Sequence, residues 1–228
     1  MLANLVKQFP TNFGVLTETS DFYWRLGFEN EAVAVLQNSV PKSRGAYRTA
    51  LARKLSERLV QTNQLNSAEQ ILAKLHDENP ADADIFHELA NVCVRTNNAD
   101  LMRKAFAETV KALRESDVKD RRELDDQIAD LRVAMITAFT RTKDYCSAVE
   151  QHIEIINREP ENEELTENAV RYVRRYGGAD VLLDYYLKLS AEAFKNYRWN
   201  VVLARIYEAN GDFENAVRNY RTAIVNQP

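Results

Sequence analysis

The chain closes with RIYEANGDFENAVRNYRTAIVNQP, residues 205–228, in which two amphipathic segments flank a Gly-Asp pair and a proline ends the second segment. On both sides of Gly211 the apolar residues recur at intervals of three and four, which is the spacing of one helix face. Glycine suits the left-handed backbone of a sharp turn, and proline suits the exit of a helix because it cannot continue one. The stretch therefore predicts two helices joined by a tight turn.

The same turn residues return at a fixed interval along the chain. Gly177 lies 34 residues before Gly211, and Asn63 lies 34 residues before Asn97. Asparagine, like glycine, tolerates a left-handed backbone. A constant spacing of such residues indicates a repeated helix–turn–helix unit rather than one irregular helical domain.

The last unit resembles a tetratricopeptide repeat, whose pattern is L-G-x2-Y…A-x3-F…P. Asn200 stands where the family has tryptophan, and Ala204 stands where it has a small glycine. Small side chains at Ala204 and Ala216 allow the two helices of a hairpin to approach closely. The residues in register with the pattern are Leu203, Ala204, Tyr207, Ala216, Tyr220 and Pro228.

Extending this frame towards the N-terminus predicts about six divergent copies in one unit of residues 1–228. The fold class is all-α, and the resemblance implies a right-handed superhelical solenoid of antiparallel helix hairpins. The predicted copies are 12–42, 43–82, 83–116, 117–162, 163–196 and 197–228, preceded by residues 1–11 as the end of another repeat.

Twelve extra residues precede the fourth copy, in the segment 115–131, and predict a lengthened first helix with an apolar side. That side would carry Val118, Leu124, Ile128 and Leu131. The chain stops at the last position of a copy, Pro228, without a polar capping helix. Because terminal repeats need such a cap, we expect a fragment of a longer array.

The composition excludes several classes of protein. Of 228 residues, 45% are hydrophobic and 28% are charged, with a net charge of -4, which argues against a general nucleic-acid binder. No apolar run approaches the about 18 residues of a membrane span, and no signal-peptide core opens the chain. The cytoplasm is therefore the default location.

No enzyme signature is present, since the chain has no Gly-rich phosphate loop, no H-E-x-x-H and no C-x-x-C. We predict that Cys93 and Cys146 are small buried hydrophobes and that His152 is a satisfied core histidine. No catalytic residue, metal site or cofactor is predicted.

In the tetratricopeptide family, positions 2, 5, 9, 12 and 13 of each copy line the binding groove. In the third copy these positions include His87 and Asn91. Helical spacing independently places Arg171, Arg174 and Arg175 side by side. The later copies bring six arginines to these positions: Arg141, Arg171, Arg174, Arg175, Arg198 and Arg205.

Two interpretations of the arginines remain open. They hold an acidic or phosphorylated peptide, or a carboxy-terminus, because the guanidinium fork matches such groups. Alternatively, they pair with Glu164, Glu167 and Glu208 on a solvated face.

We therefore predict a non-enzymatic protein–protein interaction scaffold that binds a peptide or partner segment in its groove. Asn91 matches one residue of the carboxylate clamp of chaperone-binding members, but the matching lysines are absent, so we predict no chaperone co-factor. The alternatives are a helical-repeat RNA-binding protein and an array that self-associates through its ends. Nucleic acid is the less favoured partner because positive charge is confined to the later copies, and no membrane partner is expected.

Overall fold

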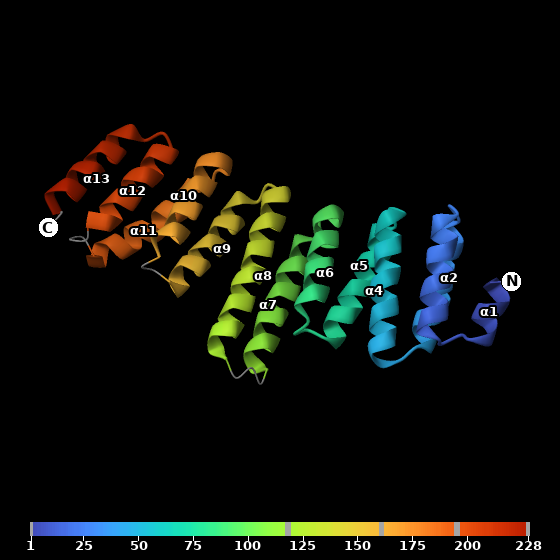
Figure 1. Ribbon diagram of the computed structural model, residues 1–228. Coiled ribbons are helices and arrows are strands. Elements are labelled where there is room, and N and C mark those ends of the chain that lie inside the picture. The colour runs from blue at the N-terminus through green and yellow to red at the C-terminus, as the bar shows by residue number, and fades with distance from the viewer. Residues whose placement is uncertain (1, 117–119, 160–161, 194–196, 227–228) are drawn as a thin grey trace. The chain divides into compact units, whose positions relative to one another are not determined.

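The computed structural model of the chain describes residues 2–116, 120–159, 162–193 and 197–226. Within these ranges every regular element is a helix, so the predicted all-α fold of consecutive hairpins is confirmed (Figure 1). By its internal contacts the chain divides into two compact units, Met1–Leu124 and Asp125–Pro228. The assignment of all residues to one superhelical array, with the copy boundaries given above, stays a prediction.

In unit 1 each helix packs against the next one along the chain. Its elements are α1 (Leu2–Gln8), α2 (Phe13–Arg25), α3 (Glu29–Ser39), the short 3-10 helix η1 (Val40–Lys42), α4 (Gly45–Gln61), α5 (Leu65–Glu78), α6 (Ala83–Thr96) and α7 (Ala99–Glu115).

In unit 2 the helices that follow α8 also pack each against the next one along the chain, and α8 itself begins in the last residues of unit 1. Its elements are α8 (Arg121–Arg141), α9 (Tyr145–Arg158), α10 (Glu163–Tyr176), α11 (Ala179–Ala193), α12 (Tyr197–Ala209) and α13 (Phe213–Asn226). We call α2, α4, α6, α8, α10 and α12 the first helices of their hairpins, and α3, α5, α7, α9, α11 and α13 the second helices.

The turns inside the hairpins have the left-handed backbone that the sequence predicts. Asn63 and Asn97 have φ values of 58° and 57°, and Gly211 has 78°. Lys143 takes the same conformation with φ 61°, at the position where glycine would be expected. Each of these residues lets the chain reverse within a few residues, so the second helix packs against the first.

Short polar side chains fix where several helices begin. Asp82 accepts a hydrogen bond from the Ile85 amide at 3.1 Å, and Asp144 accepts one from the Ser147 amide at 3.2 Å. These carboxylates satisfy backbone N–H groups that have no partner inside the helix. The caps therefore set the register of α6 and α9 and, with it, which residues face the core.

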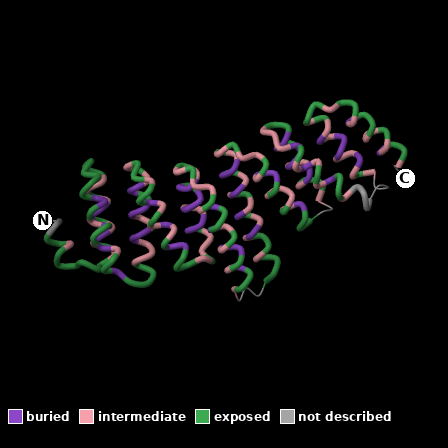
Figure 2. Tube along the Cα trace, turned by 180° about the vertical axis from the view of Figure 1, so that it is seen from behind, coloured by how far each residue is buried: buried purple, intermediate pink, exposed green. Residues whose placement is uncertain are grey.

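The core of each unit consists of leucine, other aliphatic and aromatic side chains around small contact residues. Ala32 and Ala68 in unit 1 and Ala148 in unit 2 are fully buried, as the repeat pattern predicts for the closest helix contact. Figure 2 shows buried segments interspersed along the helices, with most turns exposed. This spacing of buried residues is what a helix with one apolar face produces.

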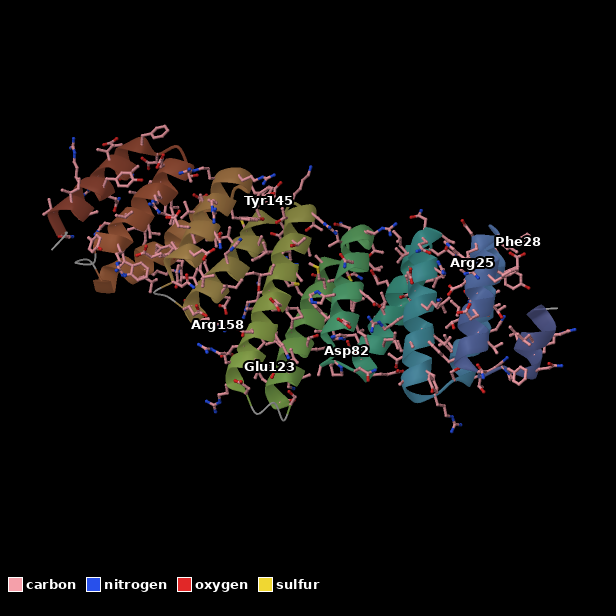
Figure 3. The ribbon with its side chains drawn as sticks, viewed as in Figure 1. Arg25, Phe28, Asp82, Glu123, Tyr145 and Arg158 are labelled. Carbon is pink, nitrogen blue, oxygen red and sulfur yellow. The ribbon has the colours of Figure 1, made fainter. Side chains whose placement is uncertain are left out.

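Helix α8 is 21 residues long and contains residues 121–131 of the extra segment 115–131 that precedes the fourth copy. Ile128 and Leu131 are buried on it, Leu124 is half-buried, and Val118 lies outside the described residues. Arg158 of α9, which Figure 3 labels, donates hydrogen bonds to Asp126 at 2.5 Å and to the Asp125 carbonyl at 3.0 Å. These bonds attach the early turns of α8 to α9.

One of the two cysteine predictions is wrong. Cys93 is buried with 1% exposure, as predicted, whereas Cys146 is exposed. Cys146 lies in the first turn of α9, where Ala148 and Val149 occupy the buried face instead. His152 packs its ring 4.9 Å from that of Tyr172, but its Nε2 atom is buried without a hydrogen-bond partner, so it is not the satisfied core histidine expected.

Candidate partner-binding face

The six predicted arginines all lie on first helices of unit 2. Arg141 ends α8, Arg171, Arg174 and Arg175 lie on α10, and Arg198 and Arg205 lie on α12. Helices α10 and α12 are in contact, and the Thr140 hydroxyl of α8 is 2.7 Å from the Tyr172 hydroxyl of α10. Unit 2 therefore places these arginines, the arginine face, on three connected helices.

Ion pairs join α10 to α12 across this face. They are Glu163–Arg198 at 3.6 Å, Arg174–Glu208 at 3.8 Å and Glu167–Arg205. All six side chains remain at least 40% exposed. Solvent-exposed pairs of this kind contribute about 0–1 kcal/mol each to stability. They align the two helices, but the arginines can leave them at little cost.

Arg171 and Arg175 lie one turn apart on α10, and both are exposed. Neither has a carboxylate within 4.0 Å among the described residues. Arg171 donates to the side-chain carbonyl of Asn168, and the Arg175 guanidinium lies 5.1 Å from the centre of the Tyr176 ring. These two arginines therefore carry charge that no acidic side chain of the described chain neutralises.

An aromatic cluster holds α10 beneath the arginines. The Tyr176 ring lies 6.0 Å from the ring of Tyr145 on α9 and 4.9 Å from that of Tyr172, measured between ring centres. Burial raises the pKa of Tyr172, although its hydrogen bond with Thr140 acts in the opposite direction. The phenol therefore stays neutral at physiological pH, and the cluster anchors α10 by packing.

The other two predicted site residues belong to unit 1. His87 is half-buried on α6, and its ring centre lies 5.7 Å from that of Phe86. The Asn91 amide donates a 2.9 Å hydrogen bond to the His87 carbonyl, within the same helix. These residues lie in unit 1 and the arginine face lies in unit 2, and their predicted membership of one common binding site stays a prediction.

Sequence reasoning missed the ion pairs on the first helices of unit 1. Asp21 on α2 pairs with Lys54 and Arg58 on α4, both at 2.7 Å. Arg53 on α4 pairs in turn with Glu88 on α6 at 2.6 Å. Partners in these pairs are 33 to 37 residues apart in the sequence, so opposite charges one repeat apart were the available signal.

The consecutive hairpins of the described residues define a helical-repeat fold. No family model matches the sequence, and no curated protein matches it. Among the described residues, no helix is long and apolar enough to cross a membrane.

Solved structures of tetratricopeptide repeat proteins are similar to this chain in fold. A tetratricopeptide repeat protein from Parabacteroides merdae is 14% identical, with 100% of this chain and 84% of that chain covered and a TM-score of 0.48. BtubC from P. vanneervenii is 14% identical, with 99% and 85% covered and a TM-score of 0.48. YrrB, described as a TPR protein with an unusual peptide-binding site, is 15% identical, with 78% and 86% covered and a TM-score of 0.36.

Proposed function

We propose that this chain is a non-enzymatic interaction scaffold whose arginine face binds an acidic or phosphorylated segment of a partner protein. The observation that carries the proposal is the pair Arg171 and Arg175, which are exposed, one turn apart and without a carboxylate partner among the described residues. A carboxylate or phosphate of the partner would supply the missing counter-charge through two-pronged hydrogen bonds.

The ion pairs around Arg171 and Arg175 are weak enough for an acidic group of the partner to displace them. Arg174 is 3.8 Å from Glu208, and both side chains are about half exposed. An incoming phosphate can therefore replace Glu208 at little cost, because a long, solvated pair is weak. The aromatic packing under α10 keeps the face in shape before the partner arrives, which limits the entropy lost on binding.

Affinity capture from the lysate of the source cell tests this role. We would compare the unchanged chain with Arg171→Glu/Arg175→Glu and with the matched reversal Arg218→Glu/Arg221→Glu on α13, each confirmed as folded by circular dichroism. We expect a protein partner that is lost only in the α10 variant. Equal retention by all three chains would remove the arginine face as the binding site.

The same capture separates the RNA-binding alternative. Nuclease treatment before elution would release the captured proteins if RNA bridged them, and the proposal predicts that they stay bound. Loss of every partner after nuclease treatment would favour a nucleic-acid ligand, since phosphates of RNA also bind arginine.

Self-association is a second candidate, favoured by the apolar surface of α13. Phe213 is 66% exposed, Ile224 is 72% and Val225 is 81%. Exposed apolar patches of this kind mark contact surfaces. Sedimentation equilibrium would show a mass that rises with concentration and falls back to one chain in Phe213→Glu/Ile224→Lys, whereas a concentration-independent mass of one chain would exclude it.

A further inference from the structure

Three metal-ligating side chains of unit 1 converge on the surface formed by two second helices. His76 and Asp77 lie near the end of α5, and Glu108 lies on α7. One potential ligand atom from each of the three lies within 4.8 Å of the others. The His76 side chain is 2% exposed, while the Glu108 side chain is 42% exposed, so a buried nitrogen faces a solvated carboxylate.

Hydrogen bonding decides which nitrogen of His76 carries the proton. The Thr109 hydroxyl donates to the Ala105 carbonyl at 2.9 Å, and His76 Nε2 lies 2.8 Å from that hydroxyl oxygen. With its one proton directed to the Ala105 carbonyl, the Thr109 hydroxyl accepts from His76, and on this ground we assign the ring N–H to Nε2. The Nδ1 atom then presents a lone pair.

That lone pair faces negative charge. Nδ1 lies 3.8 Å from a carboxylate oxygen of Glu108, too far for a hydrogen bond. Burial lowers the pKa of His76, although Glu108, Asp77 and a backbone hydrogen bond at Ala105 act in the opposite direction. Two electron-pair donors with no proton between them are stabilised by a cation placed between them.

We propose that Nδ1 of His76 and the carboxylates of Asp77 and Glu108 bind a divalent ion of the zinc type, with water completing the coordination. Neutral imidazole and carboxylates are ligands that zinc accepts, and tetrahedral ligands on zinc lie about 3.4 Å apart. The present spacing closes to that value when the exposed carboxylates rotate. Thr109 acts as the positioning residue, because metal-bound histidines use their second ring nitrogen in such a hydrogen bond.

The groups around the cluster leave it open to an ion from solvent, and one of them competes with that ion for Glu108. A surface depression of about 260 Å³ adjoins the cluster, and its lining includes Asp77, Glu108 and Glu115. Lys104 lies 3.7 Å from the second oxygen of Glu108 and must give up that contact when the ion binds. The bound ion would link α5 to α7, the second helices of two consecutive hairpins, and so stabilise their packing by mass action.

Zinc titration by calorimetry tests this site on the full chain carrying Cys146→Ser, since an exposed thiol binds zinc by itself. We expect one zinc per chain and a melting temperature that rises with zinc concentration. Glu108→Gln should weaken binding roughly tenfold or more, whereas Glu115→Gln, in the same depression but outside the cluster, should leave it unchanged. No saturable binding, or equal affinity in both variants, overturns the proposal.

Nitrogen NMR of the histidine rings gives an independent readout that needs no change to the buried ring. The chain has three histidines, so the signals are separable. The free chain should show His76 protonated at Nε2, and zinc should shift its Nδ1 signal, with the response retained in His87→Gln. A zinc response confined to His87, or a His76 ring protonated at Nδ1, would show that the cluster is not a zinc site.

Discussion

Arg58 on α4 is buried with 9% exposure and keeps its charge because several neighbours compensate it. Asp21 accepts from its guanidinium at 2.7 Å, Gln61 accepts at 2.9 Å, and the Trp24 ring centre lies 4.2 Å away. Its Nε atom has no hydrogen-bond partner. Loss of one neighbour would leave an under-compensated charge in a mostly dry site, which costs more than the pair contributes at the surface.

Asp21→Asn should therefore lower the free energy of unfolding by about 2 kcal/mol. Burial alone would raise the pKa of Asp21, but the hydrogen bonds and charges of Lys54 and Arg58 outweigh it and hold the pKa below its usual value. The contribution of Asp21 is thus present at neutral pH and is lost in acid, as the pH falls through the folded-state pKa. Urea denaturation at pH 7 measures it, with Glu18→Gln on the same helix as the control, and equal stability of the two variants would contradict it.

The second prediction at the scale of residues concerns His152 on α9. Burial lowers the pKa of His152 to about 4, from the value of about 6.5 that an unperturbed histidine has. Because only the unfolded chain then binds the proton readily, stability is lost as the pH falls from 6.5 towards 4, by up to about 3 kcal/mol. His152→Phe keeps a ring beside Tyr172 and removes the titration. The difference in melting temperature between the two chains should change across this pH range, and a constant difference would rule out the effect.

At the scale of elements, each hairpin turn contains one or two residues with a positive φ. Glycine or asparagine fills most of these positions, but Lys143 with φ 61° connects α8 to α9. A side chain with a β-carbon is strained there by about 1 kcal/mol. Packing also restricts position 178 to glycine, since a β-carbon on Gly178 would lie 3.0 Å from Val149.

Lys143→Gly should raise the free energy of unfolding by about 0.5 kcal/mol, because relief of about 1 kcal/mol of left-handed strain exceeds the roughly 0.5 kcal/mol of entropy that glycine loses on folding. Thermal or urea denaturation measures the change. Lys143→Ala is the matched control, since it removes the same charge and keeps the β-carbon, and should gain nothing. A gain shared by both variants would point to charge rather than backbone.

The period of turn residues was enough to predict the hairpins, because left-handed positions admit few residue types. The rotation of a helix about its axis is harder to predict, and it decides the contacts. Glu163 rather than Glu164 pairs with Arg198, and Cys146 points outward beside the buried Ala148. These differences amount to one or two residues along a helix, which a repeat pattern with substituted positions does not resolve.

At the scale of the molecule, the two units carry different chemistry. Unit 2 presents the arginine face, and unit 1 holds the cluster of His76, Asp77 and Glu108. The sequence placed every arginine on a first helix, because family positions transfer directly. It did not predict the cluster, since no local motif links His76 to Glu108, which lies about one repeat later.

The measurement that tests the central claim most directly is the affinity of the purified chain for labelled acidic and phosphorylated peptides, by fluorescence anisotropy. The unchanged chain should bind them more tightly than a neutral peptide of the same length, and added salt should weaken that binding. Arg171→Glu/Arg175→Glu should abolish the preference, while Arg218→Glu/Arg221→Glu, with the same change in net charge, should keep it. Equal weakening by both reversals would show that net charge alone attracts the peptide and would contradict a binding site on the arginine face.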